Sequence, residues 1–366
     1  MVIFVNATAA SEIGGLKTIV DQFIDGIQHY DNENNYYIFV SPEYTYLSSE
    51  KLQNCHFIKV DAKATSKRLK WDYFGMKKWS KTHNVYPDKI VSLQNTGVRF
   101  NNVPQIIYLH TPIPFVKYNW SFFEKNERRL WFYKKIYPYF IKSTLNKNTL
   151  LVVQSNWLKE AVSKFFNISK DNVLVNIPSI HKDSDNMKEE PNRKCERERY
   201  FYPAADYKYK NHKIVIDALK LLKANNLSAF KNTEVVFTLD KNSYVYDLAS
   251  NAGVLDNLKF VGKLDKVEMI NMYQSSNAIL FPSYIETFGL PLIEAAALGK
   301  TIYCSEETYA QEVIGEYEGV RFINPFIPRD WEKVFVEDYR EYNPFNRNQL
   351  HESWRELFRR ITHEAG

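Results

Sequence analysis

The chain has 366 residues, of which 45% are apolar and 25% are charged. These proportions are typical of globular proteins and exclude a disordered or fibrous chain, and the length predicts about two compact domains. The apolar runs are a few residues long, whereas a membrane-spanning helix needs about 20. The formal net charge of +5 is small for this length, so we expect no nucleic-acid partner.

Short β-branched or aromatic runs alternate with helical patterns along the whole chain, which predicts repeated βα units and mostly parallel sheets. The first half contains predicted strands at 1–6, 36–41, 55–60, 89–93, 105–109, 150–153 and 173–177. The second half contains predicted strands at 199–203, 234–239, 258–262, 277–281, 301–304 and 320–323. The fold class is therefore α/β in both halves.

The first residues carry no basic n-region, so we expect no secretory signal and a cytoplasmic protein. After the first strand, Gly14 and Gly15 precede a helical pattern. Paired glycines let backbone amides approach a phosphate closely, although a plain turn would also use them. No GK[ST] follows, which excludes a Walker P-loop.

Two stretches of the first half interleave basic and aromatic residues, Lys67 to Trp79 and Arg128 to Tyr137. This composition suits helices that lie on an anionic bilayer, with Trp71, Trp79 and Trp131 at headgroup depth. A solvated face over a packed apolar side fits the same pattern.

The predicted strand at 105–109 ends at His110, which is followed by Pro112 and Pro114. Ligands of open α/β sheets bind at the carboxyl ends of the strands, so the position of His110 favours a site. A structural hydrogen-bonding histidine is the alternative.

Residues 179–199 form a polar, charge-dense stretch that predicts a linker between the two halves. It contains Asp183 and Asp185 in a DxD pattern, but no apolar strand precedes them, so we interpret them as solvated and expect no metal site. The three cysteines, Cys55, Cys195 and Cys304, have no zinc-site or disulfide spacing and are expected to be free thiols.

The segment 278–300 is the most informative one. A buried strand leads into a turn, Gly289-Leu290-Pro291, and a helix that stops at Gly299. Glu286 and Glu294 bracket this turn, and the amides of residues 288–291 would face an anion or sugar hydroxyls. An ordinary strand and helix with a capping glutamate has the same spacing.

This segment, FPSYIETFGLPLIEAAALGK, resembles the E-x7-E element of the retaining GT-B glycosyltransferases of family 4. The resemblance implies two Rossmann-like domains that face across a cleft, with the nucleotide sugar held mainly by the second and the acceptor by the first. It places Glu286 at the transferred sugar and Glu294 at the nucleotide ribose. Phe288, Gly289, Leu290 and Pro291 complete the donor-binding turn.

The resemblance extends to three other positions. Gly14 and Gly15 correspond to the family's glycine-rich loop at the donor diphosphate, and His110 to the histidine that contacts the donor sugar. Lys210 corresponds to the lysine that stabilises the leaving diphosphate. The family's arginine falls at Ala204 and is absent, so Lys208 or a loop residue is expected to replace it.

The predicted domains are 1–178 on the acceptor side, the linker 179–199, 200–342 for the nucleotide sugar, and a closing helix in 343–366. The apolar face of that helix consists of Leu350, Trp354, Leu357, Phe358 and Ile361.

By resemblance, the protein is a retaining, metal-independent glycosyltransferase without a cofactor that moves a hexose from a UDP- or GDP-linked donor. Retention without an enzymic nucleophile implies front-face attack. The expected acceptor is a lipid-linked saccharide in bacterial O-antigen or capsule synthesis, which would place the enzyme peripherally on the inner face of the cytoplasmic membrane. A nucleotide-sugar epimerase of the same fold and a catalytically silent scaffold are the alternatives.

Overall fold

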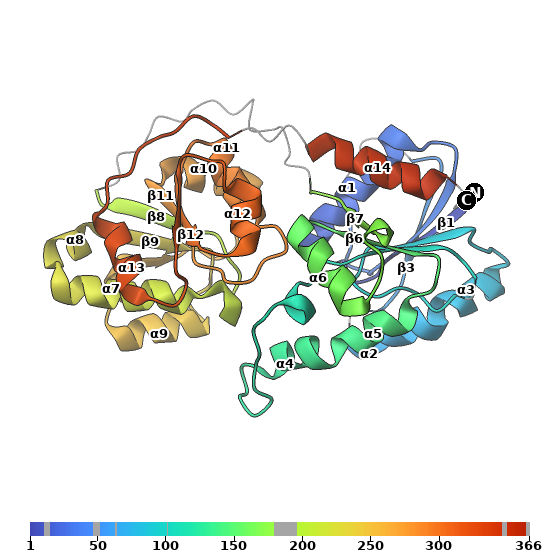
Figure 1. Cartoon of the computed structure of the whole chain (residues 1–366), viewed down its shortest axis with the longest axis horizontal. Coiled ribbons are helices and arrows are strands. Elements are labelled where there is room, and N and C mark those ends of the chain that lie inside the picture. Colours follow the sequence, from blue (N-terminus) through green and yellow to red (C-terminus); the bar gives the residue numbers. More distant parts are fainter. Residues whose placement is uncertain are drawn as a thin grey trace. The chain divides into compact units, whose positions relative to one another are not determined.

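The computed structural model describes residues 1–10, 15–46, 52–62, 64–100, 102–178, 196–345 and 350–363, the last range with its side chains from residue 353 on. The chain divides into two compact units (Figure 1). The first unit comprises Met1–Ser179 and Asn348–Gly366, and the second comprises Ile180–Arg347.

The first unit contains a parallel seven-stranded sheet with the order β3-β2-β1-β4-β5-β6-β7. Its central strands are nearly continuous apolar runs because helices cover both faces of such a sheet. The strands are β1 (Val2–Ala7), β2 (Asn35–Val40), β3 (Cys55–Lys59), β4 (Lys89–Ser92), β5 (Gln105–Tyr108), β6 (Thr149–Val153) and β7 (Val173–Val175). The helices are α1 (Gly15–Tyr30), α2 (Thr65–Lys70), the π-helical turn η1 (Trp71–Gly75), α3 (Met76–His83), η2 (Ile113–Phe115), α4 (Arg128–Lys135), α5 (Tyr137–Thr144), α6 (Asn156–Phe166), η3 (Lys170–Asn172) and α14 (Leu350–Thr362).

The second unit contains a parallel six-stranded sheet with the order β10-β9-β8-β11-β12-β13. The strands are β8 (Glu198–Tyr202), β9 (Thr233–Phe237), β10 (Leu258–Phe260), β11 (Ala278–Phe281), β12 (Thr301–Ser305) and β13 (Val320–Ile323). The helices are η5 (Lys208–Lys210), α7 (His212–Asn225), α8 (Leu227–Asn232), α9 (Tyr244–Ala252), η6 (Leu255–Asn257), α10 (Lys266–Ser275), α11 (Leu290–Ala297), α12 (Thr308–Ile314), α13 (Pro328–Lys333) and η7 (Val334–Val336).

Both sheets have a topological switch point, where the strand order reverses. It lies between β1 and β4 in the first unit and between β8 and β11 in the second. Doubly wound folds bind ligands outside the carboxyl ends of the strands at this point. The topology therefore directs attention to the loops that follow these four strands.

Helix α14 returns to the first unit and packs on α1 (Figure 1). Phe358 stacks on Phe23 with ring centroids 5.3 Å apart. Gly26 leaves room for this ring, because a Cβ atom there would lie 2.3 Å from Phe358 Cε2. The buried Lys89 of β4 donates from its Nζ to the carbonyl groups of Arg360 and Ile361 at the end of the helix and to that of His363 just after it. The predicted return of the C-terminal helix to the first domain is thus confirmed.

The two Rossmann-like sheets predicted from the sequence are present, and every predicted strand is found with bounds that differ by at most two residues. The predicted linker 179–199 ends too late, because β8 begins at Glu198. Its residues 179–195, with Asp183, Asp185 and Cys195, lie outside the described residues.

The closing helix was predicted to begin near residue 343, which is wrong. Residues 342–345 run beside α11, where Tyr342 N donates to Gly299 O and Phe345 N donates to Ala296 O. Among the side chains of its predicted apolar face that the structure describes, Trp354, Leu357, Phe358 and Ile361 are all buried. The side chain of Leu350 lies outside the described part of the helix.

The basic-aromatic stretches form helices, but Trp71 and Trp79 pack partly buried against the core of the first unit and do not point outward as predicted. The insertion of Trp131 at headgroup depth stays a prediction. Trp71 and Trp79 pack against Phe39 with centroids 5.3 and 4.9 Å away, and Trp131 packs against Phe122 at 5.0 Å. The large apolar surfaces of Trp71 and Trp79 gain more from this packing than from exposure. In the described part of the chain, no helix is long and apolar enough to cross a membrane.

Candidate active site

Two predicted catalytic residues meet at the switch point of the second unit. Lys210 ends the turn η5 that follows β8, and Glu286 lies in the loop that follows β11. The Lys210 Nζ donates to Glu286 Oε1 in an ion pair. The two side chains are only 16% and 14% exposed, so each charge depends on the other for compensation. Sequence analysis predicted both residues but not their direct contact.

Buried hydroxyl groups hold the two loops together beneath this pair. The Tyr202 hydroxyl donates to Lys210 O and accepts from Ser283 Oγ at 2.9 Å, while the Tyr309 hydroxyl donates to Ser283 O at 2.7 Å. Ser283 is fully buried and lies at the carboxyl end of β11. Sequence analysis missed these residues, since a tyrosine in an apolar run gives no sign of its hydrogen-bond partner.

The predicted donor-binding turn forms the start of α11. Gly289 has a φ of +89°, and a Cβ atom there would lie 3.2 Å from Leu292 Cδ1, so the turn requires glycine. The helix starts at Leu290, and no side chain caps it. Pro291 has no N–H and Leu292 N donates to Gly289 O, so of the first three helical residues Leu290 can offer its N–H to a ligand. The side chain of Phe288 is buried, so only its backbone can take part in binding.

Glu294 lies one turn further along α11, where it is partly buried. The buried Tyr273 of α10 donates from its hydroxyl to Glu294 Oε2 at 2.8 Å. Burial raises the pKa of Glu294, and the Tyr273 hydrogen bond and the charge of Lys266 act against this rise. The Tyr273 hydroxyl thus holds one of the two carboxylate oxygens of Glu294 in place.

The position of the family's arginine carries no cation. Ala204 is buried, and its N–H donates to Thr238 Oγ1 at 3.1 Å. Lys208 is exposed on the same turn η5 that carries Lys210. Its replacement of the arginine stays a prediction.

In the first unit, His110 follows β5 and stacks on Tyr108 with centroids 4.6 Å apart. Its Nε2 lies 3.0 Å from Leu93 O, so this nitrogen carries the proton. Burial lowers the pKa of His110 to about 4, and the imidazole is neutral at pH 7. Its Nδ1 can accept a hydrogen bond from a sugar hydroxyl, but the ring cannot act as a general acid at neutral pH.

Of the two predicted loop glycines, Gly14 lies outside the described residues and Gly15 is the first residue of α1. A Cβ atom at Gly15 would meet nothing within 4 Å. Packing therefore does not require glycine there, whereas close approach of a ligand to the backbone would.

A buried carboxyl group that sequence analysis missed lies at the switch point of the first unit. Asp72, in the π-helical turn η1, is fully buried and accepts from Asn6 Nδ2 at 2.8 Å, Gln94 Nε2 at 3.1 Å and Thr96 Oγ1 at 2.7 Å. Asn6 lies in β1, and the other two donors follow β4. Burial raises the pKa of Asp72 to about 7, against the lowering effect of these hydrogen bonds.

The Asp72 network extends to the loop after β1. Gln94 Oε1 accepts from the backbone N–H of Ala9 at 2.8 Å and from Thr8 Oγ1 at 3.2 Å. Asp72 thus fixes the residues that lead into the glycine-rich loop. The sequence did contain a sign of this network. Asp72 lies on the same buried helix face as Met76 and Ser80, and a buried acidic residue needs hydrogen-bond partners.

Within the described residues, no three His, Cys, Asp or Glu side chains are grouped to hold a metal ion. Asp183 and Asp185 are not among these residues, so the prediction concerning them stays open.

A protein-family model matches most of the second unit. Residues 183–333 match the family described as "Glycosyl transferases group 1". Over 243 residues the chain is 23% identical to the O-antigen chain mannosyltransferase RfbU of Salmonella typhimurium, and the match covers 65% of each protein. The chain thus spans just under two thirds of the length of this relative.

Solved structures resemble the whole chain. The glycosyltransferase WaaG, involved in lipopolysaccharide biosynthesis, is 15% identical with a TM-score of 0.67, and the match covers 100% of this chain and 96% of WaaG. The Anabaena protein Alr3699/HepE, crystallised with UDP and glucose, is 12% identical with a TM-score of 0.61, covering 98% and 94%. At these identities the likeness shows a shared fold, which is GT-B. Together with the family match, it supports a GT-B glycosyltransferase.

Proposed function

We propose that this protein is a retaining glycosyltransferase that moves a hexose from a UDP- or GDP-linked donor to a saccharide acceptor in bacterial O-antigen or capsule synthesis. The match to glycosyl transferases group 1 and the likeness to an O-antigen mannosyltransferase support the reaction class. The UDP and glucose bound by a protein of the same fold support the class of donor.

The observation that carries this proposal is the ion pair between Lys210 and Glu286 at the switch point. Loss of a nucleoside diphosphate from the sugar develops negative charge on the diphosphate and positive charge on the sugar. A cation and a carboxylate side by side match both charges. In the proposed complex Lys210 meets the diphosphate, Glu286 contacts the sugar, and Glu294 binds the ribose hydroxyls.

The proposed reaction breaks the bond between the sugar C1 and the diphosphate oxygen and forms a bond between C1 and the acceptor oxygen on the same face. The acceptor's proton passes to the departing diphosphate, so no enzymic base is needed. His110, neutral at pH 7, accepts a hydrogen bond from a sugar hydroxyl at Nδ1. The N-terminus of α11 and Lys210 meet the leaving charge, and the proposed reaction requires no metal ion or cofactor.

The proposed acceptor is linked to a lipid, and the proposed location is the inner face of the cytoplasmic membrane. The cationic, aromatic helices of the first unit support this location. The likeness to a protein of lipopolysaccharide biosynthesis agrees with it.

The test compares Glu286→Gln with Glu234→Gln. Glu234 of β9 is a matched control, because it is also largely shielded from solvent and forms ion pairs with two cations, Arg199 of β8 and Lys259 of β10. After a screen of UDP- and GDP-sugars and lipid-linked acceptors, we expect Glu286→Gln to lower turnover about 100-fold or more, equivalent to about 2.7 kcal/mol.

Binding of the nucleoside diphosphate should persist in Glu286→Gln, since removal of the carboxylate frees Lys210. Folded Glu234→Gln should keep turnover within a few-fold of the parent. Parental turnover in Glu286→Gln would remove the catalytic assignment. Donor conversion to an epimer without transfer would support the epimerase, and no conversion by the parent of any donor would support the silent scaffold.

A further inference from the structure

Aromatic side chains gather on the loops that follow β8, β11 and β13 in the second unit. The residues are Tyr207, Tyr209, Tyr284 and Phe326. We call them the aromatic rim. Tyr207 and Phe326 are 42% and 55% exposed, whereas rings inside the strands of this sheet, such as those of Tyr202 and Phe281, are fully buried. An exposed apolar patch at the carboxyl ends of a parallel sheet is typical of a surface that binds a ligand.

The rings of the aromatic rim are arranged in two contacting pairs. Tyr207 stacks on Tyr209 with centroids 5.4 Å apart and an angle of 5° between the ring planes. Tyr284 packs against Phe326 with centroids 5.4 Å apart. The backbone joins the two pairs, because Tyr284 N donates to Tyr209 O at 3.0 Å. The four rings therefore form one connected cluster.

Hydrogen bonds hold the three loops of the aromatic rim together. Asn211, in the left-handed conformation with a φ of +59°, donates from Nδ2 to Pro325 O at 2.7 Å and to Pro282 O at 3.4 Å. In the loop after β13, Phe326 N donates to Asn324 Oδ1 at 2.9 Å. The exposed rings thus stand on loops that are already fixed, which lowers the entropy that a ligand would lose by ordering them.

The aromatic rim is continuous with the ion pair of Lys210 and Glu286. Tyr209 precedes Lys210 in the turn η5, and the Lys210 Nζ lies 5.9 Å from the centroid of the Tyr209 ring. Tyr284 lies two residues before Glu286 in the loop after β11. A ligand on the rim would therefore lie beside the place where the donor sugar of the proposed reaction meets the ion pair.

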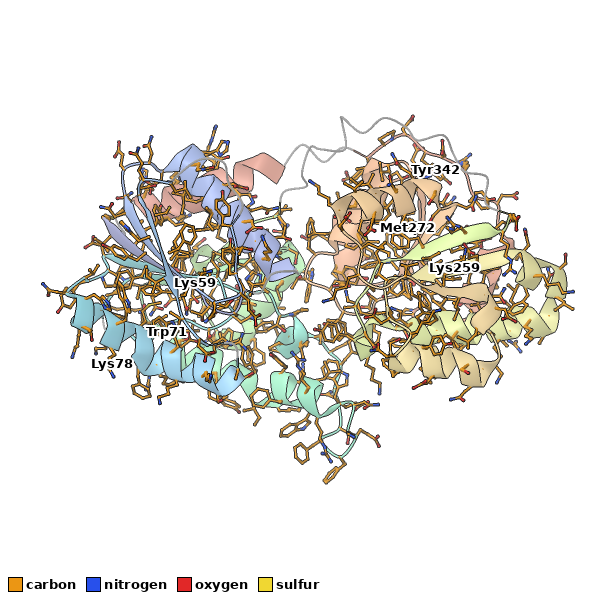
Figure 2. The ribbon with its side chains drawn as sticks, turned by 180° about the vertical axis from the view of Figure 1, so that it is seen from behind. Lys59, Trp71, Lys78, Lys259, Met272 and Tyr342 are labelled. Atoms are coloured by element: carbon orange, nitrogen blue, oxygen red, sulfur yellow. The ribbon has the colours of Figure 1, made fainter. Side chains whose placement is uncertain are left out.

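The aromatic rim and Glu294 belong to opposite faces of the second sheet. Figure 1 shows α10 and α11 on one face and α7 and α13 on the other. Figure 2 shows the same layers from behind, with Met272 on α10 and Lys259 on β10. Glu294 lies on α11, whereas the rim loops after β8 and β13 lead into α7 and α13. In the proposed complex the nucleotide extends from the ion pair toward Glu294, which leaves the rim to the other substrate.

A saccharide has the chemistry that such a surface recognises. One face of a pyranose ring presents C–H groups, which pack on aromatic rings, and its edge presents hydroxyl groups, which need hydrogen-bond partners. Tyrosine combines an apolar face with a polar hydroxyl group. Asp206 and Lys208 are exposed on the same loop as Tyr207 and add charged groups that can bind hydroxyls.

We propose that the aromatic rim is a subsite for the saccharide acceptor, where Tyr207 and Phe326 pack against the C–H faces of pyranose units next to the one that receives the sugar. The inference rests on the proposed glycosyl transfer. It adds a part of the acceptor site that lies on the second unit, whereas the sequence resemblance places the acceptor on the first.

The first experiment is saturation-transfer NMR with methyl α-mannoside, methyl α-glucoside and methyl α-galactoside as probes, in the presence of UDP or GDP. We expect the parent to saturate the C–H protons on one ring face of a bound glycoside. Tyr207→Ser with Phe326→Ser should weaken this binding about tenfold, an order of magnitude for the loss of two aromatic contacts. Tyr207→Phe with Phe326→Tyr keeps both rings and should bind as the parent does.

The matched control is Tyr86→Ser with Leu227→Ser. These side chains are 58% and 52% exposed, and they lie on segments that lead into β4 and β9, at the amino ends of the strands. The control should bind the glycosides as the parent does. Parental binding by the serine variant of the rim, an equal loss in the control, or no saturation of any glycoside by the parent would overturn the inference.

Kinetics separate this inference from the proposed function. With the donor and acceptor found in the screen, Tyr207→Ser with Phe326→Ser should raise KM for the acceptor about tenfold, with kcat and the affinity for UDP or GDP close to the parental values. Loss of nucleotide affinity would assign the rim to the nucleobase and overturn the inference. Parental kinetics in this variant would overturn the inference alone, whereas glycoside binding that depends on the rings, without transfer by the parent, would contradict the proposed function alone.

Discussion

The two units carry different polar clusters at the same topological position. At the switch point of the second unit, Lys210 and Glu286 form a partly exposed ion pair. At the switch point of the first unit, Asp72 is completely buried and accepts hydrogen bonds from uncharged side chains in β1 and after β4. A charge pair that keeps some exposure to solvent can exchange partners with a ligand, whereas a buried carboxyl group with its hydrogen bonds satisfied can only fix its surroundings. The comparison predicts chemistry in the second unit and positioning in the first.

The largest expected effect is on Lys210. Lys210→Met should lower turnover about 10²- to 10³-fold, equivalent to about 3 to 4 kcal/mol, because it removes a cation at the leaving diphosphate. Lys208→Met on the same turn is the comparison variant, and steady-state turnover with the true donor is the measurement. A loss in Lys208→Met as large as that in Lys210→Met would mean that Lys208 has taken the place of the absent arginine.

The ion pair also predicts non-additivity. Since Lys210 and Glu286 contact each other, the double variant should lose little more than the more damaged single variant. Additive losses would indicate that the two side chains act separately and that their contact has no role in turnover.

Asp72 provides the next test, through stability. The folded pKa of Asp72, about 7, lies above the ordinary value of 3.8. The folded state therefore binds more protons than the unfolded state between these values, and the contribution of this group to stability is present below pH 4 and lost as pH rises through 7. From pH 5 to pH 8 the parent should lose about 2 to 3 kcal/mol relative to Asp72→Asn.

Urea denaturation of both proteins at the two pH values measures this difference. Burial also lowers the pKa of His110, but this residue is present in both proteins, so its contribution does not affect the difference between them. A difference that does not change with pH would show that Asp72 is ionised throughout. Because Gln94 links Asp72 to Ala9, Asp72→Asn should also raise KM for the donor more than it lowers kcat.

The comparison also explains how much the sequence could predict. The strands were predictable because parallel strands buried on both faces are short apolar runs. Glu286 and Glu294 could be proposed as site residues because one continuous segment carries them. The contact of Glu286 with Lys210, the Tyr202 and Ser283 support and the Asp72 network join distant segments, so only tertiary structure places their atoms together.

The tryptophans of the basic-aromatic stretches show where composition alone misled the prediction. Composition predicted Trp71, Trp79 and Trp131 at a membrane surface, but Trp71 and Trp79 pack against Phe39 in the core of the first unit. Phe74 and Phe123 are exposed instead. Residue type gave the character of the surface, and tertiary packing decided which residues occupy it.

Glu294 has a smaller predicted effect than Lys210, confined to affinity. Glu294→Ala should weaken nucleoside diphosphate binding by about 1.5 to 3 kcal/mol, the range for hydrogen bonds to a charged group. Tyr273→Phe keeps the Glu294 carboxylate but removes the 2.8 Å hydrogen bond that it accepts, so this variant should lose less nucleotide affinity than Glu294→Ala. Calorimetry with UDP and GDP on folded variants measures both, and unchanged affinity in Glu294→Ala would contradict the assignment to the ribose.

Chelation should have the smallest effect. In the second unit the leaving diphosphate of the proposed reaction would meet Lys210 and the N-terminus of α11, and the charge of the lysine and the dipole of the helix would take the place of a metal ion. Turnover after treatment with EDTA should therefore stay within about twofold of the untreated enzyme, a change of less than about 0.5 kcal/mol. Loss of activity that magnesium or manganese restores would contradict this prediction. Asp183→Ala with Asp185→Ala would then test whether the DxD pattern supplies the ligands, because a metal held there would be lost from the double variant while Lys210 and Glu286 kept their contact.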